Sequence, residues 1–493
     1  MRAWVVALGL CACGNKKAAT REEPPEPDQP ALTEEPNPDD TEAPPAVPEF
    51  PETTRSLELI RTVSVRIAPG EAGKRIGSIA IDTRVAWRKT AKADGCKTFW
   101  IEIRPRGWIC GDYVKPSTKP AFGREVPMLD RGELVPGVYG KVTAASSMTY
   151  TFPRPEPKKK KKPAKKDGPI TSPTEVDPTV APAPQPKLVE SRPIVGSVNV
   201  RQYEELVVDG KTYWKISKGE PEYVLKQAIR QHQPSLYGGA RLGDDTGRAP
   251  PIAFVWPRVA GWRQAYTTHK SVGGGINRTL SARTAIPILE TAEKAGKPTA
   301  YRIGEAEWIA AADVRVFQPT DPPRYLQKHE RWIDVDLDSQ ILVAFEGTLA
   351  VYATMISSGG KDTPTETGEY RMWLKESEAD MKGLNGEDPY SVATVPWTQF
   401  FSPEKGLALH TAYWHDQFGT RRSHGCVNLA PRDARWLYFW SDPQVPPGWT
   451  NAAGVVEAPG SIVRVRSKDD PTPEPKGYAK KVVEARQANA PAR

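Results

Sequence analysis

The most informative stretch of the sequence is Leu409–Leu429, LHTAYWHDQFGTRRSHGCVNL. Three of the six histidines in the chain lie here, His410, His415 and His424, and none is more than 16 positions before Cys426. A thiolate attacks carbonyl carbons, and a neighbouring imidazolium can lower the thiol pKa from about 8.5 by several units. The stretch therefore predicts acyl transfer through a thioester on Cys426, with a histidine as the base.

The other cysteines have separate explanations. Cys13 follows an apolar N-terminal segment, and Cys96 and Cys110 flank a predicted β-hairpin. We expect a disulfide between Cys96 and Cys110 in an oxidising compartment. Cys426 is then left unpaired, which is a liability in such a compartment unless the reactivity of the thiol is used.

Two other interpretations of the same residues stay open. Three histidines and one cysteine could hold zinc, although their spacings match no common zinc motif. Alternatively, Cys426 could be a buried and inert thiol beside histidines of the core. Metal analysis, and labelling of the thiol at neutral pH, distinguish these interpretations from a nucleophile.

This stretch closely resembles the signature of the YkuD-type L,D-transpeptidases: a histidine, a loop, and then Ser/Thr-His-Gly-Cys-hydrophobic-Asn/Arg. Twelve residues separate His410 from Ser423, and every position of the terminal motif is matched. The resemblance covers residues 331–466 and implies a mostly β catalytic domain without cofactor or metal. It implies a cysteine acyltransferase that attacks the carbonyl at the L-centre of the diamino acid in a peptidoglycan tetrapeptide stem. D-alanine is released, and the amine of a second stem then forms an L,D cross-link.

The resemblance also assigns roles to individual residues. Cys426 is the nucleophile and His410 accepts and donates the proton, while backbone N–H groups near Gly425 and Cys426 stabilise the oxyanion. His424 and Gly425 shape the catalytic site. The candidates for orienting the loop or contacting the substrate are Ser423, Asn428, His415 and Tyr413.

Two departures from the family pattern lie close to these residues. Thr411 replaces the usual glycine after the first histidine, and the family's Thr-Pro-x-Gly element is stretched to Thr363–Gly368. The motif does not fix the acceptor, which can be a stem amine, a lysine of a protein, a D-amino acid or water. A wall-binding lipoprotein with a degenerate catalytic domain is the alternative from another functional class.

The N-terminus predicts export and a lipid anchor. A basic start precedes an apolar segment that ends at Ala12, and Leu10–Gly14 resembles a bacterial lipobox. We therefore expect a signal peptide at 1–12, lipidation of Cys13 and a disordered Pro/Glu-rich tether over 13–55. These features predict a periplasmic protein that its lipid anchors to the outer membrane.

Short alternating strands with glycine turns precede the catalytic domain. A strand, a turn and a second strand with an aromatic residue near its start recur around Gly107, Gly219 and Gly304. The fold class is therefore mainly β, with three small β-barrels, of which the first resembles bacterial SH3-like domains. The predicted order is a barrel at 56–117, a barrel at 118–245 with a disordered Lys/Pro-rich insertion at 152–188, a barrel at 246–320, the catalytic domain at 321–467 and a disordered tail at 468–493.

The composition agrees with small domains joined by linkers. Of 493 residues, 50 are proline and 38% are hydrophobic, and this proline share is about twice the average. The formal charge of +8 is modest, so no nucleic-acid partner is expected. No apolar run reaches the length of about 20 residues that a membrane span needs. We expect a monomer whose partners are peptidoglycan stems and the membrane that holds its lipid.

Overall fold

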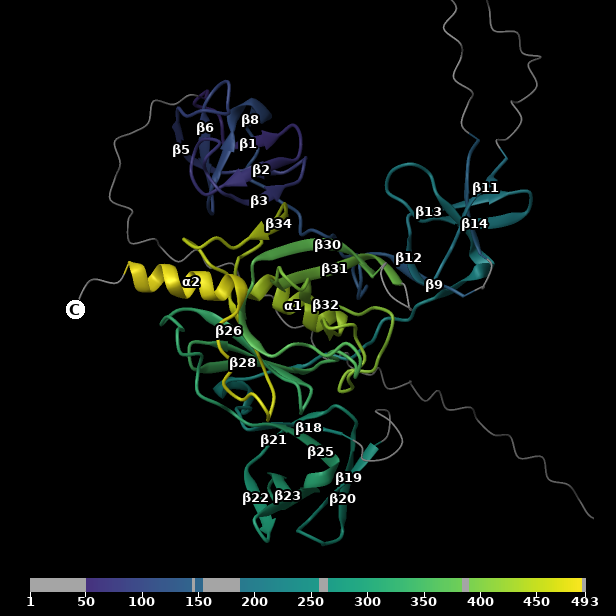
Figure 1. Cartoon of the computed structure of the whole chain (residues 1–493), viewed down its shortest axis with the longest axis vertical. Helices are drawn as coiled ribbons and strands as arrows, with labels where there is room; N and C mark the ends of the chain where they lie inside the picture. Colours follow the sequence, from purple (N-terminus) through teal and green to yellow (C-terminus); the bar gives the residue numbers. More distant parts are fainter. Residues whose placement is uncertain (1–49, 144–146, 154–186, 257–264, 384–389, 490–493) are drawn as a thin grey trace, which may run out of the picture.

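The computed structural model describes residues 50–143, 147–153, 187–256, 265–383 and 390–489 (Figure 1). These residues form a mainly β structure, which confirms the predicted fold class at that level. The signal peptide at 1–12, Cys13, nearly all of the tether and most of the insertion at 152–188 lie outside the described residues. No helix within the described ranges is long and apolar enough to cross a membrane.

Two β-sheets pack against each other in the domain at 321–467 that the motif predicts to be catalytic, called the catalytic domain below. The first has the order β17-β28-β27-β26-β35-β29, with β26 and β35 parallel. Its strands are β17 (Ala240–Arg241), β26 (Arg331–Asp336), β27 (Ile341–Glu346), β28 (Leu349–Met355), β29 (Gly368–Arg371) and β35 (Ile462–Arg466). The alternating apolar residues between 332 and 355 thus form the antiparallel meander that their pattern predicts.

The second sheet carries the residues of the motif. Its strands in the catalytic domain are β30 (Leu374–Gly383), β31 (Tyr390–Ser402), β32 (Leu407–Thr411), β33 (Val427–Leu429) and β34 (Trp449–Ala453). Ile333 of the first sheet, Leu409 of the second and Leu437 of helix α1 (Pro431–Trp440) belong to one buried core. A proline opens α1, where its missing N–H leaves no helical hydrogen bond unmade.

The first module, residues 56–117, continues this second sheet. Its strands are β1 (Ser56–Leu59), β2 (Val63–Arg66), β3 (Arg75–Ile79), β4 (Arg84–Val85), β5 (Trp87–Ala91), β6 (Trp100–Ile103), β7 (Trp108–Cys110) and β8 (Val114–Ser117). β3 pairs with β34 of the catalytic domain, where Gly77 lies opposite Ala452 (Figure 1). The first module is therefore fused to the catalytic domain through a shared sheet.

The junction between β3 and β34 depends on a residue without a side chain. Gly77 is buried, and a Cβ on it would lie 2.3 Å from Cζ3 of Trp449 and 2.7 Å from the carbonyl oxygen of Asn451. We expect Gly77→Ala to destabilise the fold by about 1–3 kcal/mol through overpacking, measured as a lower midpoint of thermal unfolding. Gly219→Ala is the control, since nothing lies within 4 Å of a Cβ there. Equal midpoints for the two variants would contradict this account of the junction.

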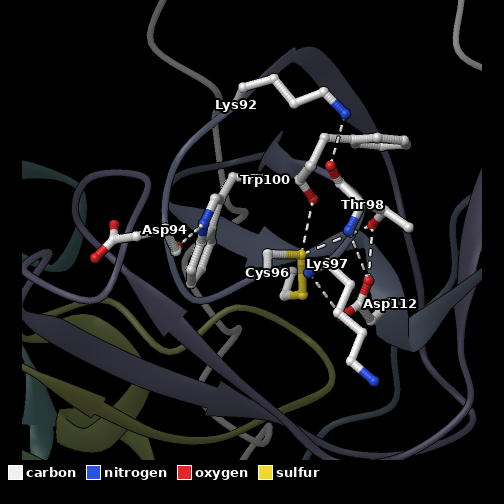
Figure 2. The surroundings of a disulfide bond; sticks show 9 residues. Lys92, Asp94, Cys96, Lys97, Thr98, Trp100 and Asp112 are labelled. Carbon is white, nitrogen blue, oxygen red and sulfur yellow. Dashed lines mark hydrogen bonds between the residues drawn. A yellow bond between two sulfur atoms is a disulfide. The ribbon is translucent and has the colours of Figure 1, made fainter.

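A disulfide joins Cys96 to Cys110 beside the end of β7 (Figure 2). The Asp112 carboxylate accepts hydrogen bonds from the backbone N–H groups of Lys97 and Thr98, each at 3.0 Å. The turn that carries Cys96 is thus tied to the following segment by the disulfide and by one carboxylate. Among the described residues, Cys426 is the free cysteine.

The second module, which begins near residue 138, joins the other side of the catalytic sheet. Its strands are β9 (Val138–Val142), β10 (Met148–Thr151), β11 (Val189–Pro193), β12 (Ser197–Gln202), β13 (Glu204–Val208), β14 (Lys211–Lys215), β15 (Tyr223–Leu225) and β16 (Ile229–Gln231). β12 runs parallel to β31, with Ser197 opposite Tyr390. The sheet order β16-β9-β12-β31-β30-β34-β3 therefore crosses two modules and the catalytic domain between them.

The third module, residues 252–317, contacts the loop of the motif. Its strands are β18 (Ile252–Val255), β19 (Ala265–His269), β20 (Ile276–Ser281), β21 (Ala285–Pro287), β22 (Glu290–Lys294), β23 (Lys297–Gly304), β24 (Glu307–Ala310) and β25 (Val314–Phe317). All three modules end alike, with a hairpin, a 3-10 turn and a last strand. The 3-10 turns at these ends are Gly111–Tyr113, Lys226–Ala228 and Ala311–Asp313. This shared ending agrees with the threefold recurrence in the sequence.

Two predicted boundaries differ from the structure. The range 118–245 assigned to the second barrel includes β17, which pairs with β28 and so belongs to the catalytic sheet. The tail at 468–493, expected to be disordered or a frayed helix, contains a packed helix α2 (Gly477–Ala488), because Val482 is fully buried and Arg486 pairs with Glu330 at 2.6 Å. The apolar face of this helix is short, so the Lys- and Ala-rich composition of the segment did not indicate a packed helix.

Candidate active site

Two adjacent parallel strands, β32 and β33, bring His410 and the bend that carries Cys426 to one cavity. In the register of β32 with β33, His410 lies opposite Asn428, and Cys426 precedes Asn428 by two residues. Cys426 itself lies in the bend that leads into β33, so this register brings the end of the bend close to His410. His410, Cys426 and Asn428 line a single cavity of about 260 Å³.

The His410 ring is buried and held in one orientation. Its Nδ1–H donates a hydrogen bond of 2.9 Å to the carbonyl oxygen of Thr411, which leaves Nε2 as the unprotonated nitrogen. Burial lowers the pKa of His410 to about 4, so the ring is neutral at pH 7. The acceptor is the main-chain carbonyl of residue 411, which a glycine there would supply equally. This arrangement suits a base that takes a proton through Nε2.

The Cys426 thiol is half-buried and protonated in the free protein. Burial raises its pKa to about 11, against the opposing effect of a hydrogen bond from the backbone of Ala408. The expectation of a thiolate stabilised by an imidazolium is therefore not met, because burial favours the neutral form of both Cys426 and His410. The pair is a thiol beside a neutral imidazole, and the proton has to move during the attack.

A tight turn from Ser423 to Cys426 fixes the approach to the thiol. Gly425 has φ +118°, a conformation that other residues rarely adopt. The Ser423 hydroxyl accepts a hydrogen bond from the Gly425 N–H at 3.2 Å and donates one to the carbonyl oxygen of Cys426. Because the Gly425 N–H is occupied, it is not an open oxyanion donor here, in contrast to the sequence-based expectation.

The stretched Thr-Pro element stabilises this turn through hydrogen bonds. Thr365 Oγ1 donates a hydrogen bond of 2.7 Å to the Gly425 carbonyl and accepts one of 2.8 Å from the Gly359 N–H. The N–H of Gly360 donates to the Ser423 carbonyl at 2.8 Å. The sequence analysis did not give Thr365 a role, although the Thr-Pro-Thr run was the available signal.

The remaining residues of the motif divide into lining and supporting positions. His424 lines the cavity, and its ring stacks on Tyr390 with centroids 4.3 Å apart. His415 is buried outside the lining, where Nδ1 accepts from the Gln417 N–H and Nε2 lies 3.1 Å from the Asn428 amide. Burial lowers the pKa of His415 to about 3, so it is neutral.

Tyr413 also lies outside the cavity lining. It is fully buried, stacks on Tyr139 with centroids 4.0 Å apart, and donates its hydroxyl proton to the Ala393 carbonyl at 3.0 Å. The structure thus places Tyr413 and His415 behind the cavity wall, although both were candidates for substrate contact. His415 contacts Asn428, which lines the cavity. Tyr413 contacts Ala393 on β31, the strand that contributes Tyr390 and Val392 to the lining.

The third module holds the loop between the two catalytic candidates. Arg283 makes a two-pronged ion pair with Asp416, at 2.6 and 3.0 Å, and Arg315 donates to the carbonyl oxygen of Gly419 at 2.6 Å. The Gly419 N–H in turn donates to Ile356 of the catalytic domain at 2.6 Å. The loop that separates His410 from Cys426 is therefore anchored on both sides.

The second module forms a wall of the cavity. Five of its residues belong to the lining: Lys141, Ser197, Asn199, Arg230 and His232. The sequence analysis missed all of them, because the pairing of β12 with β31 has no local sequence signal. The candidate site is thus shared between the catalytic domain and the second module.

Potential metal ligands do not gather around the motif. Within the described part of the chain, three such ligand atoms converge only at Cys96, Cys110 and Asp112. Both sulfur atoms there are bonded to each other. The described histidines near Cys426 therefore form no zinc set.

Comparison with known proteins finds similarity in this part of the chain. Residues 330–465 match the family model of the L,D-transpeptidase catalytic domain, YkuD. The Bacillus subtilis protein YciB, an L,D-transpeptidase by name, is 28% identical over 156 residues, which are 29% of this chain and 77% of that protein. L,D-transpeptidase 2 of Mycobacterium tuberculosis is 33% identical over 97 residues, which are 18% of this chain and 23% of that protein.

A solved structure is also similar to part of this chain. The catalytic domain of the Enterococcus faecium L,D-transpeptidase is 26% identical, with a TM-score of 0.22, and the match covers 28% of this chain and 98% of that one. The family model and the two relatives support a YkuD-type L,D-transpeptidase catalytic domain, in agreement with the resemblance of the motif. The family match lies within 330–465 and does not extend to the three modules.

Proposed function

We propose that this chain is a peptidoglycan L,D-transpeptidase. Cys426 attacks the carbonyl at the L-centre of the diamino acid in a tetrapeptide stem, D-alanine leaves, and an acceptor amine takes the acyl group to form an L,D cross-link. The observation that carries the proposal is that Cys426 and the oriented His410 line one cavity, in a domain that matches this family.

The neutral pair suggests how the protons move. As Sγ bonds to the carbonyl carbon, Nε2 of His410 takes the thiol proton, and the resulting imidazolium then gives it to the departing D-alanine amine. In the second half the acceptor amine attacks the thioester, loses a proton to Nε2, and the thiol is restored. One amide breaks and one forms. The backbone N–H of Cys426 is our candidate for the oxyanion donor, since the Gly425 N–H is engaged.

The compartment follows from the same proposal. A peptidoglycan enzyme works in the cell envelope, and the lipobox-like sequence before Cys13 supports a periplasmic protein anchored to the outer membrane. The disulfide between Cys96 and Cys110 agrees with an oxidising compartment. Growth in labelled lipid precursor, followed by mass analysis of the N-terminal peptide, tests the lipid on Cys13.

The direct test of the proposed function uses the full chain and purified disaccharide-tetrapeptide. Intact-mass analysis is expected to show a covalent adduct of the donor minus D-alanine, with peptide mapping to Cys426, and free D-alanine in solution. Addition of a second stem should discharge the adduct into a cross-linked dimer. Release of D-alanine without an adduct on Cys426, or no reaction with tetrapeptide, would reject the proposal.

The neutral state of the pair gives a prediction for pH. Iodoacetamide, unlike a stem positioned for proton transfer to His410, reacts with the thiolate that is present at equilibrium. Because the pKa of Cys426 is raised to about 11, its rate of alkylation should rise about tenfold per pH unit from 7 to 10. Peptide mapping of alkylated protein at each pH gives this rate. An alkylation rate that is already constant between pH 5 and 7 would instead show a preformed thiolate, and would contradict this account of the pair.

A further inference from the structure

A row of directly paired residues crosses four strands at the wall of the cavity. Arg230 on β16 lies opposite Lys141 on β9, Lys141 lies opposite Asn199 on β12, and Asn199 lies opposite Val392 on β31. Directly paired residues share a face of the sheet. All four line the cavity that holds Cys426, so the row runs from the second module to the catalytic domain along one face.

Among the residues that the structure describes, no carboxylate on the wall pairs with the two cations in this row. Lys141 and Arg230 are direct cross-strand neighbours, an arrangement that is destabilising for like charges. Arg422 brings a third cation to the same cavity, and within the described residues no Asp or Glu belongs to its lining. Charges of one sign held together against their repulsion are typical of a site built for a ligand of the opposite charge.

The neutral groups of the wall fit the same ligand. His232 Nε2–H donates to Asn199 Oδ1 at 2.7 Å, which leaves the amide nitrogen as the remaining donor of Asn199. Burial, with Arg230 and Lys141 nearby, lowers the pKa of His232 to about 4, so this ring is neutral. The wall therefore offers N–H donors and positive charge, which is what a carboxylate accepts.

The row is also adjacent to the reacting thiol. Ser197, two residues before Asn199, lies opposite Tyr390, whose ring stacks on His424. Burial and the nearby Cys426 raise the pKa of Tyr390. A peptide with its carbonyl at Cys426 can thus extend along Tyr390 toward the second module.

We propose that Lys141 and Arg230 of the second module, with Asn199 between them and His424 and Tyr390 leading to the thiol, form a subsite that binds a carboxylate of the acyl-donor peptide. This inference rests on the proposed function, because it names the part of the donor that the second module recognises. The second module is then a component of the active site, and the preferred substrate is an acidic peptide.

The experiment measures recognition separately from chemistry. The Cys426→Ala protein is titrated by calorimetry with tetrapeptide donors that carry free carboxylates, with donors amidated at the C-terminal D-alanine, and with donors amidated at the internal carboxylates. Lys141→Gln/Arg230→Gln is compared with Lys187→Gln/Lys211→Gln, which removes the same charge from exposed positions of the same module. Thermal unfolding of each variant accompanies the titrations.

The expected result is a Kd for the fully acidic donor that rises about 10- to 100-fold in Lys141→Gln/Arg230→Gln and stays unchanged in the control. The thermal midpoint should be unchanged or higher, because the repulsion is relieved. One of the two amidated donors should also bind the parent protein about 10- to 100-fold more weakly. If it is the donor amidated at the C-terminal D-alanine, the subsite binds the terminal carboxylate; if it is the other donor, the subsite binds an internal carboxylate. A folded Lys141→Gln/Arg230→Gln protein that binds like the control, or a parent that binds all donors equally, overturns the subsite.

Acylation of the same charge variants with Cys426 intact distinguishes a failure of the proposed function from a failure of the proposed subsite. If no donor acylates Cys426 in the parent protein, the proposed function fails, while the binding constants still decide the subsite. If acylation proceeds and the acidic donor reacts equally fast with Lys141→Gln/Arg230→Gln and with the control, the subsite alone fails.

Discussion

Replacement of Cys426 by alanine is expected to abolish acyl-enzyme formation, D-alanine release and cross-linking together. Loss of a nucleophile in a hydrolase lowers turnover by more than about 10⁴-fold. The three readouts should fall together because each passes through the same thioester. Mass analysis of the protein and chromatography of the stems measure them in one reaction. The alternatives for the acceptor are affected equally, since a stem amine, a protein lysine and water all resolve that one intermediate.

Cys426→Ala also tests whether the loss is chemical. The Cys426 side chain is only half-buried, and removing its sulfur should lower the thermal midpoint little. Cys426→Ser is the matched variant, since it keeps the shape of the side chain with a far weaker nucleophile. D-alanine release by folded Cys426→Ala at the parent rate would mean that another residue attacks the stem.

The catalytic motif could be predicted from the sequence because its members lie close together along the chain. His410 and the Ser423–Cys426 turn are joined by one loop, so their spacing is itself the signal. The recurring hairpin at the end of each module also had a sequence signal, since strand and turn patterns are local. The consecutive turn residues that hold Gly425 in its φ +118° conformation belong to the same motif.

The walls and supports of the site could not be predicted in this way. Lys141 reaches the cavity only because β12 pairs with β31, and the register of two distant strands leaves no trace in either segment alone. The same holds for Arg283 and Asp416, whose ion pair joins the third module to the catalytic loop. Modules that the sequence predicts as separate barrels are instead parts of one body, and removing the first would expose Trp449 at β34.

The protonation state was misjudged for a related reason. A protein environment can turn a cysteine beside a histidine into an ion pair, but the sequence contains no measure of how deeply each group is buried. The His410 side chain is 2% exposed. The free-energy cost of burying a charged imidazolium there is larger than the stabilisation that it gains from a neutral thiol. Desolvation therefore determines the resting state of this pair.

His410→Gln is expected to lower the rate of acylation by tetrapeptide about 10³- to 10⁴-fold at pH 7, and the loss should shrink as pH rises. Without a base the reaction depends on thiolate that forms unaided, and with the pKa of Cys426 raised to about 11 this is about one molecule in 10⁴ at pH 7. The rate of the variant should then increase about tenfold per pH unit.

The parent enzyme behaves differently over the same range, because neutral His410 accepts the thiol proton at any pH well above its pKa of about 4. Single-turnover acylation of the parent, His410→Gln and the control His415→Gln between pH 6 and 10 measures the three profiles. His415 lies behind the cavity wall, so its replacement should give a loss of similar size at every pH. A His410→Gln deficit that is also constant with pH would mean that this ring positions the substrate or the turn, and that some other group removes the proton from sulfur.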